Sequence, residues 1–175
     1  LKGWILANMG PKNKLLIVGS GPLETALKTA HGADDSVIWL GFVADEHRRI
    51  EILRGADAFI LPSLVEGLSL SLLEAMACGT ACIATDAGAD GEVLENGAGS
   101  GIGTQRVAQQ LQTILPLLNN HPEMLAILSS KARQRVLARY PLSKNITQLE
   151  NLYAQIVPSK ARYSVPQRVR WIEQF

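Results

Sequence analysis

The sequence predicts an α/β fold, a Rossmann-like parallel sheet with helices on both faces. Short apolar segments alternate with amphipathic ones along the chain, as expected when each strand is followed by a crossover helix. The strand segments are continuous apolar runs, such as Leu15-Leu-Ile-Val18, which are typical of strands buried on both faces. With 175 residues, of which 47% are hydrophobic and 19% charged, the chain is long enough for one domain with a hydrophobic core.

The elements are expected in a regular order, with glycine, proline or aspartate between them. The expected strands span residues 14–19, 37–41, 57–61 and 80–85, with a short fifth near 101–102. The expected helices span residues 22–30, 45–54, 70–77, 104–118, 121–140 and 143–157. Pro22 marks an early helical position, and Asp45 and Thr104 are expected N-caps. Residues 1–7 resemble the second half of a helix, and the strand expected to open a parallel α/β unit does not precede them.

Two parts are therefore expected, a domain truncated at its N-terminus (1–157) and a basic C-terminal tail (158–175). Three interpretations of the tail stay open: a loosely ordered terminus, a segment packed on another domain, and peripheral contact with an anionic membrane. The net charge of +1 gives no general reason to expect nucleic-acid binding. No apolar run approaches the roughly 20 residues of a membrane span.

The two cysteines, Cys78 and Cys82, lie four residues apart in apolar surroundings. Zinc sites need a second pair of ligands, and the chain has neither further cysteines nor a histidine at ligand spacing. We interpret both as small buried hydrophobic residues of a reducing compartment and predict no metal site.

The segment from Leu61 to Thr80 carries the strongest functional signal. Glu66 lies in a glycine-containing turn after an apolar strand, and Glu74 lies eight residues later in a helix. The turn leads into the N-terminus of that helix, where free backbone N–H groups and the helix dipole favour an anion. Two carboxylates around an anion site suit a ligand with a phosphate and several hydroxyl groups, such as a nucleotide sugar.

Five segments in this order resemble the group 1 retaining glycosyltransferases. They are Leu15-Leu-Ile-Val-Gly-Ser-Gly-Pro22, Trp39-Leu-Gly-Phe-Val43, Ala56-Asp-Ala-Phe-Ile-Leu-Pro-Ser63, Glu66-Gly67 through Glu74-Ala-Met-Ala-Cys-Gly79, and Ala84-Thr-Asp86 with Glu92. Enzymes of this family have two facing Rossmann-like domains. The resemblance is to the C-terminal, donor-binding domain and covers residues 1–157.

The resemblance implies a role for each matching position. Glu66 would be the catalytic carboxylate, the first of the family's Glu-x7-Glu motif, close to the donor sugar. Glu74 would be the second and would accept hydrogen bonds from the ribose hydroxyls. The remaining donor-binding positions would contact the sugar, diphosphate or nucleobase mainly through their backbone: Gly19, Gly21, Phe42, Val43, Gly67, Leu68 and Ser69. A purely structural role stays open for the glycines as tight-turn residues, for Phe42 as core-edge packing, and for both glutamates as surface acids.

The chain also departs from the family pattern. Leu68-Ser69 stands where the family often has Phe-Gly, and Gly88-Ala89 stands where it often has two glycines. The arginine and lysine that neutralise the donor diphosphate would lie upstream of these 175 residues.

The sequence thus predicts the donor half of a retaining enzyme that transfers a sugar from a nucleoside diphosphate sugar to an acceptor, in glycan, polysaccharide or glycolipid synthesis. The resemblance implies no cofactor and no metal, an N-terminal acceptor domain as partner, and a cytoplasmic location that includes the inner face of the membrane. The alternative is a catalytically inactive, stand-alone nucleotide-binding or assembly module. An NAD-dependent dehydrogenase is disfavoured because Glu24 replaces the third glycine of its fingerprint and Gly41 replaces the ribose-binding acid.

Overall fold

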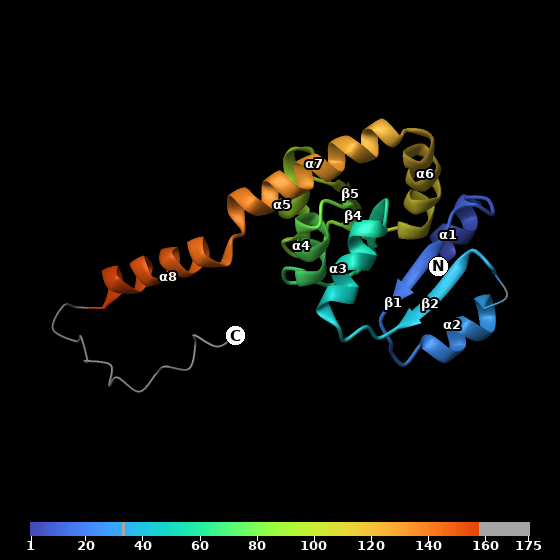
Figure 1. The fold of residues 1–175 in the computed structure, drawn as a ribbon, viewed down its shortest axis with the longest axis horizontal. Helices are drawn as coiled ribbons and strands as arrows, with labels where there is room; N and C mark the ends of the chain where they lie inside the picture. The colour runs from blue at the N-terminus through green and yellow to red at the C-terminus, as the bar shows by residue number, and fades with distance from the viewer. Residues whose placement is uncertain (33, 158–175) are drawn as a thin grey trace. The chain divides into compact units, whose positions relative to one another are not determined.

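The computed structural model describes residues 1–32 and 34–157 and consists of helices and short parallel strands (Figure 1). The strands are β1 (Leu15–Val18), β2 (Val37–Gly41), β3 (Ala58–Leu61), β4 (Ala81–Thr85) and β5 (Ser100–Ile102). The helices are α1 (Lys2–Ala7), α2 (Glu24–His31), α3 (Glu46–Gly55), α4 (Leu70–Ala77), α5 (Asp90–Leu94), α6 (Val107–Asn120), α7 (Pro122–Arg139) and α8 (Leu142–Ile156), with a 3₁₀ turn at Glu95–Gly97.

The chain divides into two units, Leu1–Arg139 and a second that begins at Tyr140. All strands described belong to the first unit. The second contains α8, which places apolar side chains three or four residues apart along one side, including Leu142, Ile146 and Leu149. The expected domain boundary at residue 157 remains a prediction, and the expected basic tail (158–175) lies outside the described residues.

The strands form two parallel sheets. β1 pairs with β2, and β4 lies between β3 and β5. Among the described residues, β1 has no strand partner on the edge opposite β2, and β3 has none on the edge opposite β4. β4 is buried along its whole length, which explains its continuous apolar sequence.

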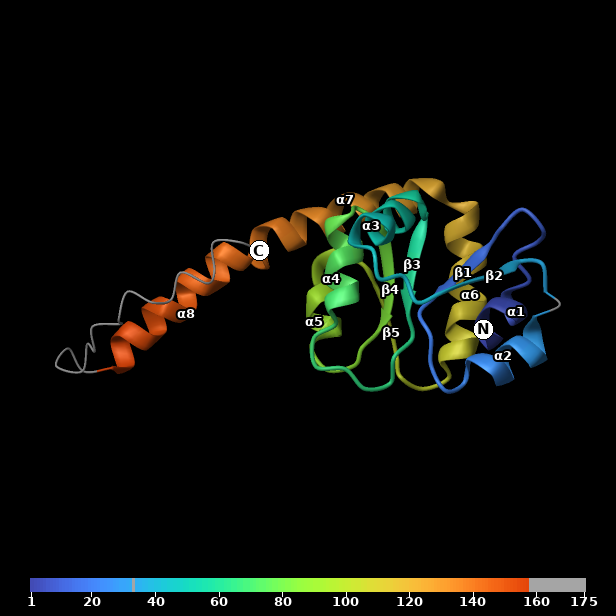
Figure 2. The same cartoon turned by 60° about the horizontal axis from the view of Figure 1, so that its bottom comes forward.

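One layer of helices covers both sheets. α1 and α6 lie side by side, and the core beneath them combines Trp4 of α1 and Leu111 and Leu115 of α6 with Val37 of β2 and Ile83 of β4. Figure 2 shows β3, β4 and β5 between α6 on one side and α4 and α5 on the other. The predicted fold class, a parallel α/β arrangement with helices on both faces, is confirmed.

A hydrogen-bond chain fastens α1 to the start of β2. The indole N–H of Trp4 donates to Oγ of Ser36 at 2.8 Å, and the Ser36 hydroxyl donates to Oδ1 of Asp34 at 2.6 Å. The Ser36 backbone N–H donates to the same carboxylate oxygen at 2.9 Å. These hydrogen bonds from Ser36 hold the pKa of Asp34 below its usual range.

Three helix starts differ from the expectation, each for a local reason. α2 begins at Glu24, because Pro22 and Leu23 form a turn closed by the Glu24 N–H and the Gly21 carbonyl. The predicted N-cap at Thr104 is wrong, since α6 begins at Val107. The Gln110 side chain bonds both backbone groups of Gly103 at 2.9 Å and thereby keeps the preceding residues in a loop. α5 was not expected at all, because a partly polar segment of five residues is too short to give a periodic signal.

The packing of α1 on α6 should make Gly3 intolerant of a side chain. A Cβ at Gly3 would lie 2.7 Å from Cβ of Leu111 and 3.2 Å from the Ala108 carbonyl oxygen. We expect Gly3→Ala to lower the free energy of unfolding by about 1–3 kcal/mol, measured by urea titration, because the two helices must separate. Gly55→Ala is the matched control, since nothing lies within 4 Å of its Cβ. It should be neutral or stabilising by up to about 1 kcal/mol. Equal losses from both variants would contradict this account of the packing.

Candidate functional site

The sequence-predicted site residues, apart from Glu74 in α4, lie after the carboxyl ends of three strands, β1 and β2 of one sheet and β3 of the other. Gly19 directly follows β1, Phe42 directly follows β2, and Glu66 lies in the turn between β3 and α4. The fourth loop at this edge, residues 86–89, follows β4. Carboxyl ends of parallel strands are the usual place for ligand binding in open α/β sheets.

The first group of residues joins the loops after β1 and β2. Gly19 donates its N–H to the Gly41 carbonyl at 2.7 Å, and its φ of 124° is a conformation that side chains disfavour. Phe42 is 75% exposed, so it is not core-edge packing, and its ring is open to a ligand. Arg49 holds the backbone after Val43 by donating to the Ala44 carbonyl at 2.9 Å.

Gly21 differs from Gly19. A Cβ there would meet nothing within 4 Å, and its φ is not in the left-handed region. The structure therefore gives a backbone reason for glycine at position 19 and none at position 21.

The second group is the Glu66–Ser69 turn. Glu66 is half-buried, and its carboxylate makes no hydrogen bond or ion pair with any described residue. The backbone N–H groups of Gly67 and Leu68 likewise have no partner among residues 1–32 and 34–157. Ser69 is different, because its N–H donates to Oδ1 of Asp90 at 2.9 Å. Three backbone amides were expected to face the donor substrate. Two of them have no partner in the described part of the chain, and the third, of Ser69, is hydrogen-bonded to Asp90.

Ser69 also caps the helix that follows. Its hydroxyl oxygen accepts from the Leu72 N–H at 3.3 Å, and its backbone is extended, as N-cap residues usually are. A glycine at this position would lack that hydroxyl. The departure from the common Phe-Gly pattern therefore strengthens the start of α4.

Glu74 lies on the exposed side of α4, whereas Leu72, Ala75 and Met76 fill the buried side. Helical periodicity directs the Glu74 carboxylate outward, so it is exposed although its neighbours in sequence are apolar. It makes no hydrogen bond or ion pair with a described residue. Its role in binding ribose remains a prediction.

The turn is held by residues 85–90, which run from the last residue of β4 through the 86–89 loop to the first residue of α5 and are called the 85–90 loop below. The Thr85 hydroxyl donates to the carbonyls of Ser63 and Leu61, and the Ala89 N–H donates to the Gly67 carbonyl at 2.8 Å. Gly88 has a φ of 59°, and a Cβ there would lie 2.1 Å from the Glu66 carbonyl oxygen. This contact requires glycine at position 88 for two reasons, backbone conformation and space.

The alanine that replaces the family's second glycine needs no compensation. Ala89 has φ −93° and ψ 0°, a conformation open to any L-residue. Glu92, the last residue of this motif, forms an exposed ion pair with Arg139 of α7 at 3.3 Å. The loop is therefore tied to the turn on one side and to α7 on the other.

No hydrogen bond among the described residues joins the Gly19–Val43 group to the Glu66–Ser69 turn. The structure thus brings the predicted residues together as two groups at one edge, each held within its own sheet.

Comparison with known proteins decides the family. The family model described as Glycosyl transferases group 1 matches residues 5–120, more than half of the chain. The chain belongs to this family. N-acetyl-alpha-D-glucosaminyl L-malate synthase of Bacillus anthracis is 32% identical over 152 residues, which are 82% of this chain and 38% of that protein. This group 1 glycosyl transferase chain therefore spans about two fifths of the length of that relative.

Solved structures agree with this assignment. The C-terminal domain of the glycosyl transferase group 1 family protein LpcC from Francisella tularensis superimposes with a TM-score of 0.67 at 27% identity, covering 81% of this chain and 79% of that one. HepE of Anabaena in complex with UDP superimposes with a TM-score of 0.75 at 23% identity, covering 87% of this chain and 44% of that one. The second likeness concerns the fold alone.

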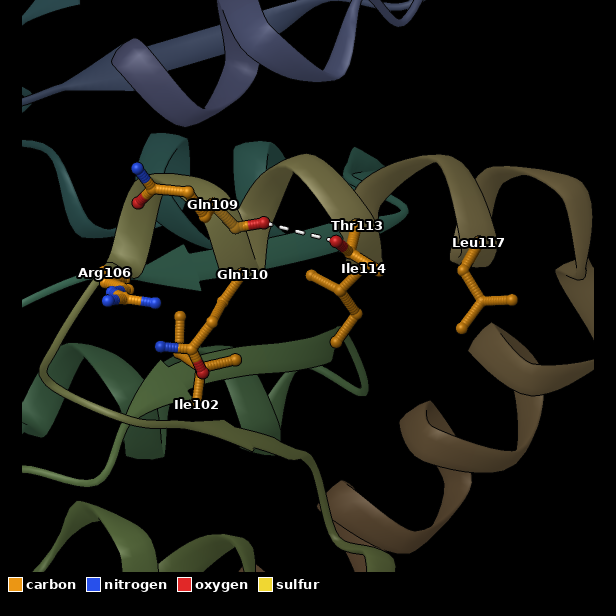
Figure 3. Close-up of a pocket in the computed structure, with 7 residues that line it drawn as sticks. All are labelled: Ile102, Arg106, Gln109, Gln110, Thr113, Ile114 and Leu117. Carbon is orange, nitrogen blue, oxygen red and sulfur yellow. Dashed lines mark hydrogen bonds between the residues drawn. The ribbon is translucent and has the colours of Figure 1, made fainter.

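A separate hollow of about 530 Å³ lies along α6 (Figure 3). Arg106 and Gln110 lie towards one end and Leu117 towards the other, with Ile102 of β5 beneath. It shares no residue with the predicted site of this glycosyl transferase. Apart from Arg106 its lining residues carry no charge, so we assign it no chemistry.

Within residues 1–32 and 34–157, no helix combines the length and apolar character needed to cross a membrane. The same residues contain no group of three or more histidine, cysteine or acidic side chains placed to hold a metal ion.

Sequence reasoning missed Asp90 and Thr85, the two side chains that attach the 85–90 loop to the strand and turn before α4. Both are fully buried polar residues: Thr85 is the last residue of the apolar strand β4, and Asp90 is the first residue of α5. That combination is the signal that could have indicated them, because polar groups are buried where they have partners.

Exchange of glycine and alanine should cost much more stability at position 88 than at position 89. We expect Gly88→Ala to lower the free energy of unfolding by about 2–4 kcal/mol, because its Cβ overlaps the Glu66 carbonyl and φ is positive. Ala89→Gly, which restores the common glycine pair, should cost less than about 1 kcal/mol. Urea titration measures both. A tolerated Gly88→Ala would show that the turn does not approach the loop this closely.

The two thiols should react very differently. Burial, with a smaller effect of nearby Cys78, raises the pKa of Cys82 to about 12, so its thiol stays protonated at pH 8. We expect a thiol reagent at pH 8 to modify half-buried Cys78 in the native chain and Cys82 only after unfolding, as read by peptide mass spectrometry. Cys78→Ser is the control and should leave no fast-reacting thiol. Equal native rates for both cysteines would contradict the burial of Cys82.

Proposed function

We propose that this chain is the donor-binding domain of a retaining glycosyltransferase that transfers a sugar from a nucleoside diphosphate sugar to an acceptor. The observation that carries the proposal is the Glu66–Ser69 turn. It presents, at the carboxyl edge of a parallel sheet, a carboxylate and two amides that have no hydrogen-bond partner in the described part of the chain. Family membership, and the UDP present in the HepE structure, support a nucleotide sugar as the ligand.

The residues of the turn suit the two charges that separate during sugar transfer. When the bond between sugar and diphosphate breaks, positive charge develops at the anomeric carbon and negative charge on the leaving phosphate. The Glu66 carboxylate would balance the first, and the amides of Gly67 and Leu68 would donate to the second. The two amides lie just before the N-terminus of α4, where the helix dipole favours an anion.

Nucleotide binding would involve the other predicted residues. The exposed Phe42 ring offers a face for the nucleobase, and the exposed Glu74 carboxylate offers two acceptor oxygens to neighbouring ribose hydroxyls. Ser69 would act through the start of α4, since its N–H is engaged by Asp90.

We infer that retention proceeds by same-face displacement assisted by the leaving phosphate, because no side chain of this turn is placed as an activated nucleophile. The proposal includes no metal, an acceptor held by a second domain, a cytoplasmic location, and a role in glycan, polysaccharide or glycolipid synthesis. This chain spans 38% of the relative from B. anthracis, so the rest of that relative is long enough to contain a second domain.

The proposal is tested by calorimetric titration of the chain with UDP, GDP and ADP. We expect one nucleotide to bind in preference to the others. Glu74→Ala should weaken the binding of that nucleotide roughly tenfold or more, as expected for losing hydrogen bonds to a charged acceptor. Glu51→Ala is the matched control, since Glu51 is also an exposed glutamate within a helix, α3. The proposal is wrong if no nucleotide binds, and Glu74 has no part in it if Glu74→Ala binds like Glu51→Ala.

A further inference from the structure

Asp90 is a fully buried carboxylate that the proposed mechanism does not use. Its side chain is 0% exposed, although aspartate is among the residues least often buried without partners. Oδ1 accepts the Ser69 N–H at 2.9 Å, and no described residue donates to Oδ2. Burying a carboxylate in this way costs free energy that one hydrogen bond to an amide does not fully offset.

The surroundings show what balances the charge. Asp90 is the first residue of α5, and its acceptor contact is with Ser69, the N-cap of α4. The carboxylate therefore lies at the N-terminal ends of two helices, where the partial positive charges of the backbone favour an anion. Within the described part of the chain, it forms no ion pair with a lysine or arginine. Its Oδ1, by accepting the Ser69 N–H, joins the start of α5 to the start of α4.

Asp90 differs from Gly88 and Ala89 in how it contacts the turn. Gly88 and Ala89 contact the turn through their backbones, by the close approach to Glu66 and the hydrogen bond to Gly67. Asp90 contacts it with its side chain, at Ser69. Its bond lies one residue beyond Gly67 and Leu68, whose amides are free. The position of these amides depends on the hydrogen bonds on either side of them.

We propose that Asp90 is a positioning residue of the donor site. Its Oδ1 fixes the Ser69 amide, sets the start of α4, and leaves the amides of Gly67 and Leu68 as the donors for a diphosphate. This rests on the proposed function, in that the turn is taken to bind a nucleoside diphosphate. The attachment of Ser69 itself does not depend on that function and is measurable without ligand.

Two variants of the 175-residue chain test the proposal. Asp90→Ala removes the acceptor, whereas Asp90→Asn keeps a carbonyl oxygen at the same place and the same volume. Hydrogen exchange of the Ser69 amide is measured by NMR without ligand, and affinity is measured by calorimetric titration with UDP, GDP and ADP. In Asp90→Ala we expect at least tenfold faster exchange at Ser69 and at least tenfold weaker binding of the preferred nucleotide. In Asp90→Asn both should stay within about threefold of the original chain.

A control separates positioning from general loss of stability. Gly3→Ala destabilises the contact of α1 with α6, far along the chain from the turn, and should leave nucleotide affinity unchanged. Temperature is adjusted so that Gly3→Ala and Asp90→Ala have the same folded fraction. Equal loss of affinity in both would overturn the proposal, as would unchanged Ser69 exchange in Asp90→Ala. Asp90→Asn behaving like Asp90→Ala would also overturn it, since the charge would then be needed directly.

Failure of the proposed function gives a different result. If the original chain binds none of the three nucleotides, the donor-site assignment fails whatever the variants do. Ser69 exchange still decides whether Asp90 holds the turn: faster exchange in Asp90→Ala supports that attachment, and equal exchange rejects it.

Discussion

The close approach of two backbone segments, the Glu66–Ser69 turn and the 85–90 loop, is the constraint on which the candidate site depends. A glycine with positive φ at position 88 lets the loop touch the Glu66 carbonyl. Once the segments are that close, the Ala89 N–H reaches Gly67 and the Asp90 carboxylate reaches Ser69. The strands β3 and β4, paired in parallel register from Ala58 with Ala81 to Leu61 with Ala84, bring both segments to the same edge. A free carboxylate and two free amides are thus displayed on a turn whose ends are fixed.

The fold could be predicted from the sequence because its main signals are local. Apolar runs as short as Leu15–Val18 fit strands, and Asp45 caps α3 as expected, with its carboxylate accepting the Arg48 N–H at 2.7 Å. The division into two sheets could not be predicted, because strand pairing depends on contacts between distant segments. The start of α6 was missed for a similar reason. The Gln110 side chain reaches back seven residues to Gly103, and no propensity at Thr104 reveals that bond.

The motif residues of the candidate site could be predicted from the sequence, whereas the contacts that hold the turn in place could not. Glu66, Glu74 and the glycine turns were singled out by their motifs. The structure locates Glu66 in the turn after β3 and Glu74 in α4, and their roles in donor binding remain predictions. The pairing of Ser69 with Asp90 joins residues 21 apart, and nothing in either local sequence indicates it. The same holds for Ala89: its replacement of a glycine looked like a weakness in the motif, yet its backbone conformation suits alanine. Sequence motifs identify groups that touch a ligand more readily than the buried polar groups that hold them.

Within residues 1–32 and 34–157, β1 and β3 each have one edge without a strand partner, which affects how the chain behaves among other chains. Each edge offers a row of backbone N–H and C=O groups on a short apolar strand, and Leu16 and Val18 of β1 are 42% and 46% exposed. Such an edge is a template for another strand, and neither β1 nor β3 contains a proline or a charged residue that would discourage pairing. The same strands that present the turn at their carboxyl ends leave backbone N–H and C=O groups open to pairing along one edge. At high chain concentration, exposed backbone groups along a strand edge favour pairing between copies, so the two sheet edges bear on solubility as well as on the fold.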